Sequence, residues 1–167
     1  MACGDWAALG PDRLTSATLG DRSGGALAAV ERTVGDTSTL WAATSTGRVF
    51  ISKNVDAEPA SAVAWTRLDS TAANDPNRFV TGIYVDPANG NRAWVSYSGF
   101  NSATPATPGH VFEVTYNPGT GTATWIDRSF DLGDLPITDI VRDDVTGDLY
   151  ASSDFGVVRL VAGSASW

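Results

Sequence analysis

The chain has 167 residues and a mass of 17.5 kDa, which suffices for one hydrophobic core. Its formal net charge is −8, and its 11 Lys and Arg residues are scattered singly, which excludes a nucleic-acid partner because neutralising phosphates needs clustered basic residues. The single cysteine, Cys3, excludes an intrachain disulfide and a cysteine-based metal site.

The composition predicts an all-β fold. Gly and Pro number 17 and 8, and they are mixed with many Ser, Thr, Asn and Asp residues, which is typical of a chain that turns often. No stretch keeps a helical apolar period free of Gly, Pro or β-branched runs, so we expect few and short helices. The chain has no apolar window of about 18 residues and no signal-peptide pattern, so we expect no membrane partner.

The first expected element is a short strand at residues 4–10, "GDWAALG", which contains Trp6 and Leu9. After a long connection, three repeated units follow, at about 27–69, 79–129 and 137–167. Each unit has a β-rich strand, a polar turn, a strand with an aromatic residue, and a glycine hinge that leads to a third strand. The aromatic residues are Trp41, Trp94 and Tyr150, and the hinges are Gly47, Gly109 and Gly156.

A tryptophan follows the third strand of every unit. These residues are Trp65, Trp125 and Trp167, and Trp6 has the same local context near the start of the chain. Four short antiparallel strands in a unit of about 40 to 60 residues are typical of a β-propeller blade. We therefore expect three four-stranded antiparallel blades, a partial or half propeller, in which the third blade lacks its fourth strand.

The tryptophan turns carry a resemblance to a known family. They read "SKNVDAEPASAVAW", "TYNPGTGTATW" and "VAGSASW", and they resemble the turn Ser/Thr-x-Asp-x-Gly-x-x-x-Trp of BNR or Asp-box repeats in the final Trp and part of the glycine pattern. These repeats build the sialidase-like β-propellers of large secreted bacterial proteins, including xyloglucan-hydrolysing enzymes. The resemblance implies an extracellular or periplasmic parent protein and carbohydrate as a ligand.

No catalytic residue is predicted. The arginines, tyrosine nucleophile and acids of sialidases have no matching motif in this chain, and Asp86 and Asp143 read as turn residues that cap their own backbone. The segment "DDVTGD" at 143–148 lacks the spacing of a calcium loop, so a hairpin turn explains it better than a metal site. We expect neither a metal nor a cofactor.

The insertion in the second unit is the candidate binding surface, because recognition usually lies where a repeat is interrupted. It carries Tyr97, Phe100 and Asn101 on a loop that the other units lack, and it ends at His110, which we expect to be an exposed strand residue. The repeated tryptophans are predicted to fill the core between blades instead.

Two functions are compatible with these patterns. The first is a non-catalytic scaffold or interaction module that assembles into a closed ring, and the alternative is part of a glycan-active, sialidase-like or xyloglucanase-like hydrolase. Three blades make too tight a ring, whereas two copies give six. We therefore predict a homodimer in which residues 4–10 of one copy complete the third blade of the other, with Trp6, Leu9 and Trp167 at the junction.

Overall fold

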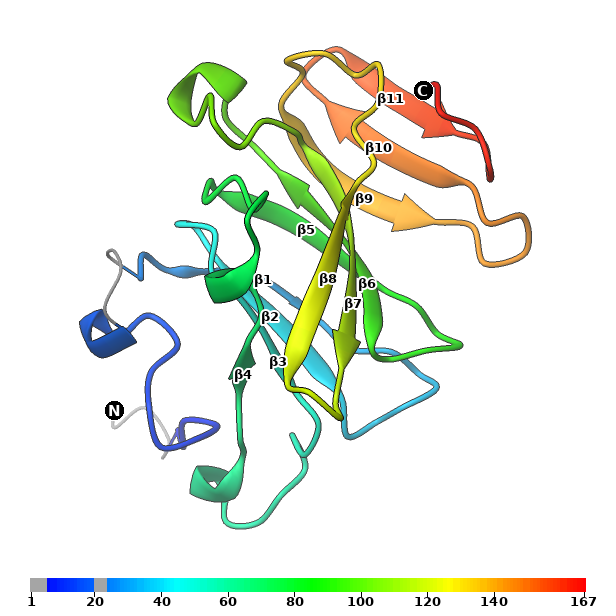
Figure 1. The fold of residues 1–167 in the computed structure, drawn as a ribbon. Helices are drawn as coiled ribbons and strands as arrows, with labels where there is room; N and C mark the ends of the chain where they lie inside the picture. The colour runs from blue at the N-terminus through cyan, green and yellow to red at the C-terminus, as the bar shows by residue number, and fades with distance from the viewer. Residues whose placement is uncertain (1–5, 20–23) are drawn as a thin grey trace, which may run out of the picture.

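The computed structural model describes residues 6–19 and 24–167. Its fold is all-β, with eleven strands in three antiparallel sheets, which we name sheets A, B and C in chain order (Figure 1). The prediction of three successive antiparallel sheets is therefore confirmed. Cys3 and the first two residues of the predicted strand at 4–10 lie outside the described residues.

Each sheet is a meander in which consecutive strands pair. Sheet A contains β1 (Leu27–Glu31), β2 (Leu40–Thr44), β3 (Val49–Ser52) and β4 (Thr66–Arg67). Sheet B contains β5 (Val80–Val85), β6 (Arg92–Tyr97), β7 (Val111–Asn117) and β8 (Thr122–Asp127). Sheet C contains β9 (Ile137–Arg142), β10 (Leu149–Ser153) and β11 (Gly156–Leu160).

The first hairpin of every sheet is closed by the same side-chain cap. In each turn an aspartate Oδ1 accepts a hydrogen bond from the backbone N–H two residues later, and the three aspartates are Asp36, Asp86 and Asp143, at 3.2, 2.9 and 2.8 Å. An aspartate in this position replaces a backbone turn bond and so fixes the hairpin locally. The predicted turn role of Asp86 and Asp143 is confirmed.

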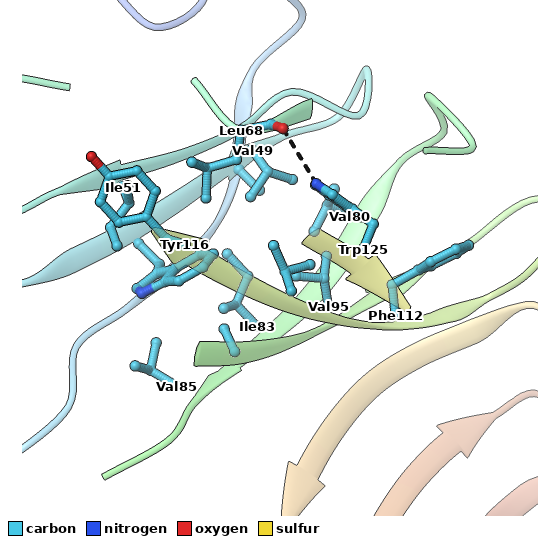
Figure 2. Packing of buried hydrophobic residues seen from close by; sticks show 14 of the residues in the cluster. Val49, Ile51, Leu68, Val80, Ile83, Val85, Val95, Phe112, Tyr116 and Trp125 are labelled. Atoms are coloured by element: carbon cyan, nitrogen blue, oxygen red, sulfur yellow. Dashed lines mark hydrogen bonds between the residues drawn. The ribbon is translucent and has the colours of Figure 1, made fainter. Parts of the chain in front are cut away.

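The sheets pack face to face along the chain. The first strands lie side by side, β1 next to β5 and β5 next to β9, and Figure 1 shows sheet B between sheets A and C, with the C-terminus beside sheet C. The core between sheets A and B includes Trp41, Phe112 and Trp125 (Figure 2). The core between sheets B and C includes Trp94 and Ile140. Trp41, Trp94 and Trp125 therefore fill the space between sheets, as predicted, whereas Trp65 is half-buried and belongs to neither core.

Sheet C has three strands where sheets A and B have four. Within residues 6–19 and 24–167, no strand pairs with the outer edge of β11. The helical elements of this described part are 3₁₀ turns of three residues, none of them long or apolar enough to cross a membrane: η1 (Ala17–Leu19), η2 (Ala60–Ala62), η3 (Asp69–Thr71) and η4 (Asn101–Ala103).

Candidate functional site

Three of the four residues predicted to bind a ligand lie together in one polar cluster. Tyr97 is fully buried, and its hydroxyl donates to Asp75 Oδ1 at 2.8 Å. Asn101 Oδ1 accepts a hydrogen bond from the N–H of Gly109 at 2.9 Å. The fourth residue, Phe100, points outward and is 58% exposed, so the structure separates it from the polar groups.

His110 is buried, and the expectation that it would be exposed is wrong. Its Nε2 lies 3.3 Å from Asp134 Oδ1, and its Nδ1 lies 3.4 Å from the carbonyl oxygen of Tyr97. Desolvation, reinforced by the nearby positive charge of Arg78, lowers the pKa of His110 below its ordinary value of 6.5. The folded protein therefore favours the neutral imidazole.

Arg78 organises this cluster, and no sequence pattern indicates this role. Its Nη1 donates to Asn101 Oδ1 at 3.1 Å, and its Nη2 donates to the carbonyl oxygen of Gly109. Arg78 is only 6% exposed, and burial lowers its pKa. Because its guanidinium points into the loop at 98–110 and bridges both arms, the cluster holds the insertion in place.

A cavity of about 390 Å³ lies between sheets B and C, and three arginines line it. The guanidinium carbons of Arg92 and Arg142 lie 5.2 and 4.9 Å from the ring centroid of Trp94. A carboxylate accompanies each arginine: Asp86 beside Arg92, Glu113 beside Arg128, and Asp144 beside Arg142. Each arginine is therefore paired with a carboxylate, of which Glu113 also lines the cavity. Trp94 is 5% exposed, so its ring is not a platform for a ligand.

The carboxylates of the turn at 143–148 are also engaged within the protein. Asp143 Oδ1 accepts from the N–H groups of Val145 and Thr146. Asp148 is buried, and its Oδ2 accepts from Arg159 Nε at 2.8 Å. Backbone hydrogen bonds lower the pKa of both carboxyl groups, and Arg159 lowers that of Asp148 further. The segment forms a hairpin turn, as predicted from its sequence.

The tryptophans that follow the third strands share one contact. In each case the indole Nε1 donates to a backbone carbonyl oxygen that belongs to the preceding part of the chain. The donor–acceptor pairs are Trp65 with Leu9, Trp125 with Leu68, and Trp167 with Arg128, at 2.9, 3.3 and 2.9 Å. Figure 2 shows the second of these hydrogen bonds, where Trp125 reaches from sheet B to the end of sheet A.

The acceptors also occupy equivalent positions. Leu68 is three residues after Trp65, and Arg128 is three residues after Trp125, so each acceptor directly follows the outer strand of a sheet. Leu9 is likewise three residues after Trp6. Leu9 therefore makes with Trp65 the same contact that Leu68, directly after the outer strand of sheet A, makes with Trp125.

Residues 6–9 are held against sheet A although they form no strand there. Besides the bond to Trp65, the N–H of Gly10 donates to the carbonyl oxygen of Ala60 at 2.9 Å. Arg48, which is fully buried, donates from Nη1 to the backbone carbonyl oxygens of the following connection. Trp6 is 92% exposed and Leu9 40% exposed. This segment is anchored at its end and presents a large apolar side chain to solvent.

Trp167 lies against the core between sheets B and C. Its backbone N–H donates to Asp131 Oδ1 at 2.7 Å, in addition to the indole bond to Arg128. Trp167 thus fills the tryptophan position of sheet C without adding a strand to β11. The free edge of β11 and the segment Trp6–Leu9 together form the candidate assembly site.

Comparison with known proteins adds no assignment to this geometry. No family model matches the chain, and no curated protein matches it significantly.

Proposed function

We propose that the protein is a non-catalytic scaffold in which sheets A, B and C are blades of a β-propeller whose ring is completed by a second copy. The repeated indole–carbonyl hydrogen bond carries this proposal. This hydrogen bond joins sheet B to sheet A and sheet C to sheet B in the same way. Trp65, directly before β4, forms the same bond with Leu9, in the segment that precedes sheet A in the chain. When neighbouring sheets are joined by the same contact, a further sheet is expected to be joined by that contact too.

The outer face of sheet C supports the same proposal. Tyr150 pairs with Arg159 as Trp41 pairs with Ile51, so the two pairs are equivalent. Trp41 and Ile51 are buried, whereas Tyr150 is half-buried and Arg159 is exposed. Val141, which pairs with Tyr150, is 48% exposed. A face that is covered in one repeat and bare in the next is typical of an interface.

The usual number of blades in a closed ring indicates which partner completes it. Three blades are fewer than the four to eight blades usual for β-propellers, and a second copy with two-fold symmetry brings the total to six. We therefore propose a homodimer as the assembled form, in which the outer face of sheet C of each copy meets sheet A of the other.

Light scattering tests this function. The expected molar mass is that of two copies of the 17.5 kDa chain, and Val141→Asp should shift it to one copy by placing a charge in the interface. Val145→Asp is the matched control, because Val145 is 95% exposed on a hairpin turn and should leave the dimer intact. A monodisperse monomer for the intact protein would refute the proposed assembly.

The non-catalytic part of the proposal has its own test. Asp143 caps backbone N–H groups, Asp86 does so and pairs with Arg92, and Asp148 pairs with Arg159, so these three turn carboxylates are engaged within the protein. Incubation with a panel of polysaccharides should release no reducing sugar. Hydrolysis of any of them would instead support the glycan-active alternative.

A further inference from the structure

We propose that residues 6–9 of a second copy pair with the free edge of β11 in one defined register, and that the partner's Trp6 replaces Trp167 in the tryptophan position of sheet C. This inference rests on the proposed dimer and names the segment that closes it. The donated segment need not leave its own sheet A to make this contact. In the equivalent case within one chain, Leu68 accepts the hydrogen bond from Trp125 of sheet B while its own strand remains in sheet A.

Sheets A and B fix the register. In sheet A, Phe50 is opposite Arg67, which is two residues after Trp65. In sheet B, Phe112 is opposite Asp127, which is two residues after Trp125. The equivalent residue of β11 is Val158, because it pairs with Ala151 as Phe50 pairs with Ala42 and Phe112 with Val95. The partner of Val158 is therefore the residue two after Trp6, which is Ala8.

The backbone hydrogen bonds agree with this register. The N–H of Leu68 donates to the carbonyl oxygen of Val49, and the N–H of Arg128 donates to that of Val111, both at 2.8 Å. The corresponding bond at the new edge runs from the N–H of the second copy's Leu9 to the carbonyl oxygen of Val157. An unpaired strand edge has such groups available along its length.

Two tryptophans then compete for one position. In the same register, Trp6 is opposite Leu160, as Trp125 is opposite Val114, and its indole is directed to the site that Trp167 occupies. Trp167 holds this site through Arg128 and Asp131, whereas Trp6 is 92% exposed in the single chain. Exchange replaces one indole by the other and adds strand pairing along β11, so the exchange favours the dimer.

A designed disulfide tests the register. In a Cys3→Ser background, Ala8→Cys with Val158→Cys should give a covalent dimer under oxidising conditions, because opposite residues in an antiparallel pair lie within the Cα separation that a disulfide allows. Figure 1 shows the segment that begins at residue 6, in dark blue, beside sheet A and β11 on the far side of the molecule, so a bond within one chain is not expected. Ala8→Cys with Val161→Cys is the control, because Val161 is three residues further along and should not cross-link.

Two single variants test the competition between tryptophans. Trp6→Ala should weaken dimerisation at least about 30-fold, the effect of a buried interface tryptophan. Trp167→Ala should instead strengthen it at least about 10-fold, because the competing indole is gone. If Trp167 only stabilised the fold, Trp167→Ala would weaken dimerisation instead.

The outcomes separate this inference from the proposed function. A dimer by light scattering that cross-links through residues 8 and 158, and not through the control pair, supports both. A dimer that does not cross-link, or one that Trp167→Ala weakens, overturns the exchanged strand and leaves the scaffold function standing. A monomer in light scattering overturns both.

Discussion

Trp94→Ala is expected to lower the free energy of unfolding by about 3–5 kcal/mol, the usual loss for a buried large aromatic residue. Trp94 is 5% exposed and packs between sheets B and C against Ile140 and Leu149. A buried tryptophan covers about 150–250 Å², which corresponds to about 4–6 kcal/mol at about 25 cal/mol per Å². The alanine methyl group retains part of this, and partial collapse of the cavity recovers some more.

The guanidinium groups beside Trp94 add a smaller contribution. Arg92 and Arg142 lie 5.2 and 4.9 Å from its ring centroid, and each cation–π contact contributes about 0.5–1 kcal/mol at accessible sites. Removing the ring also opens the neighbouring arginine-lined cavity to the interior. The two arginines keep their carboxylate partners, so no charge is left unpaired, and the loss stays within the range of about 3–5 kcal/mol.

Urea unfolding monitored by circular dichroism measures this loss. With a slope of about 2 kcal/mol per M, the midpoint should fall by about 2 M. Phe155→Ala is the matched control, because Phe155 is an aromatic residue that is 90% exposed, and its removal should change stability by less than about 0.5 kcal/mol. If Trp94→Ala unfolded at the parent's midpoint, the packing of Trp94 between sheets B and C would not stabilise the fold.

Three further predictions concern the polar cluster and one hinge. Since the pKa of His110 is lowered on folding, stability should be complete above pH 6.5 and fall below it, by at most about 1.4 kcal/mol per pH unit. His110→Gln should flatten urea midpoints between pH 7 and 5.5, and an unchanged slope would contradict this. Asn101→Ala should cost about 1.5–3 kcal/mol in urea unfolding by removing a part-buried acceptor of the charged Arg78; no loss would mean that water replaces it. Gly47 and Gly121 both have positive φ, but a Cβ on Gly47 would lie 2.6 Å from backbone atoms, whereas one on Gly121 meets nothing within 4 Å. Gly47→Ala should therefore lower the thermal midpoint clearly more than Gly121→Ala, and equal losses would contradict the clash.

The strands and turns could be predicted from the sequence because their signals are local. Asp86 and Asp143 cap turns through N–H groups two residues away, and the glycine hinges at 47, 109 and 156 supply positive φ. The repeat then placed Trp41 and Trp94 between sheets, and both are buried. A residue that recurs at one position of a repeat meets the same neighbours each time, so its burial follows from the alignment.

The candidate site depended on contacts that the sequence does not display. The sequence predicts that Asn101 binds a ligand from the inserted loop, but its side-chain oxygen accepts a hydrogen bond from Arg78, which lies 23 positions earlier in the chain. His110 was expected at the surface, and the connection after β8 covers it through Asp134. Both differences have one cause: loops from separate sheets converge there, and the burial of a polar side chain is set by which loops meet.

The amino-acid sequence by itself determined the all-β class, the three-fold repeat and the turn chemistry, since these depend on residues close together in the chain. Tertiary structure decided which carbonyl each repeated indole reaches. The acceptors of Trp65 and Trp125 lie 56 and 57 positions away, and only the packing of one sheet on the next brings them within hydrogen-bond distance. Through this packing, Leu9 makes with Trp65 the contact that Leu68, directly after the outer strand of sheet A, makes with Trp125.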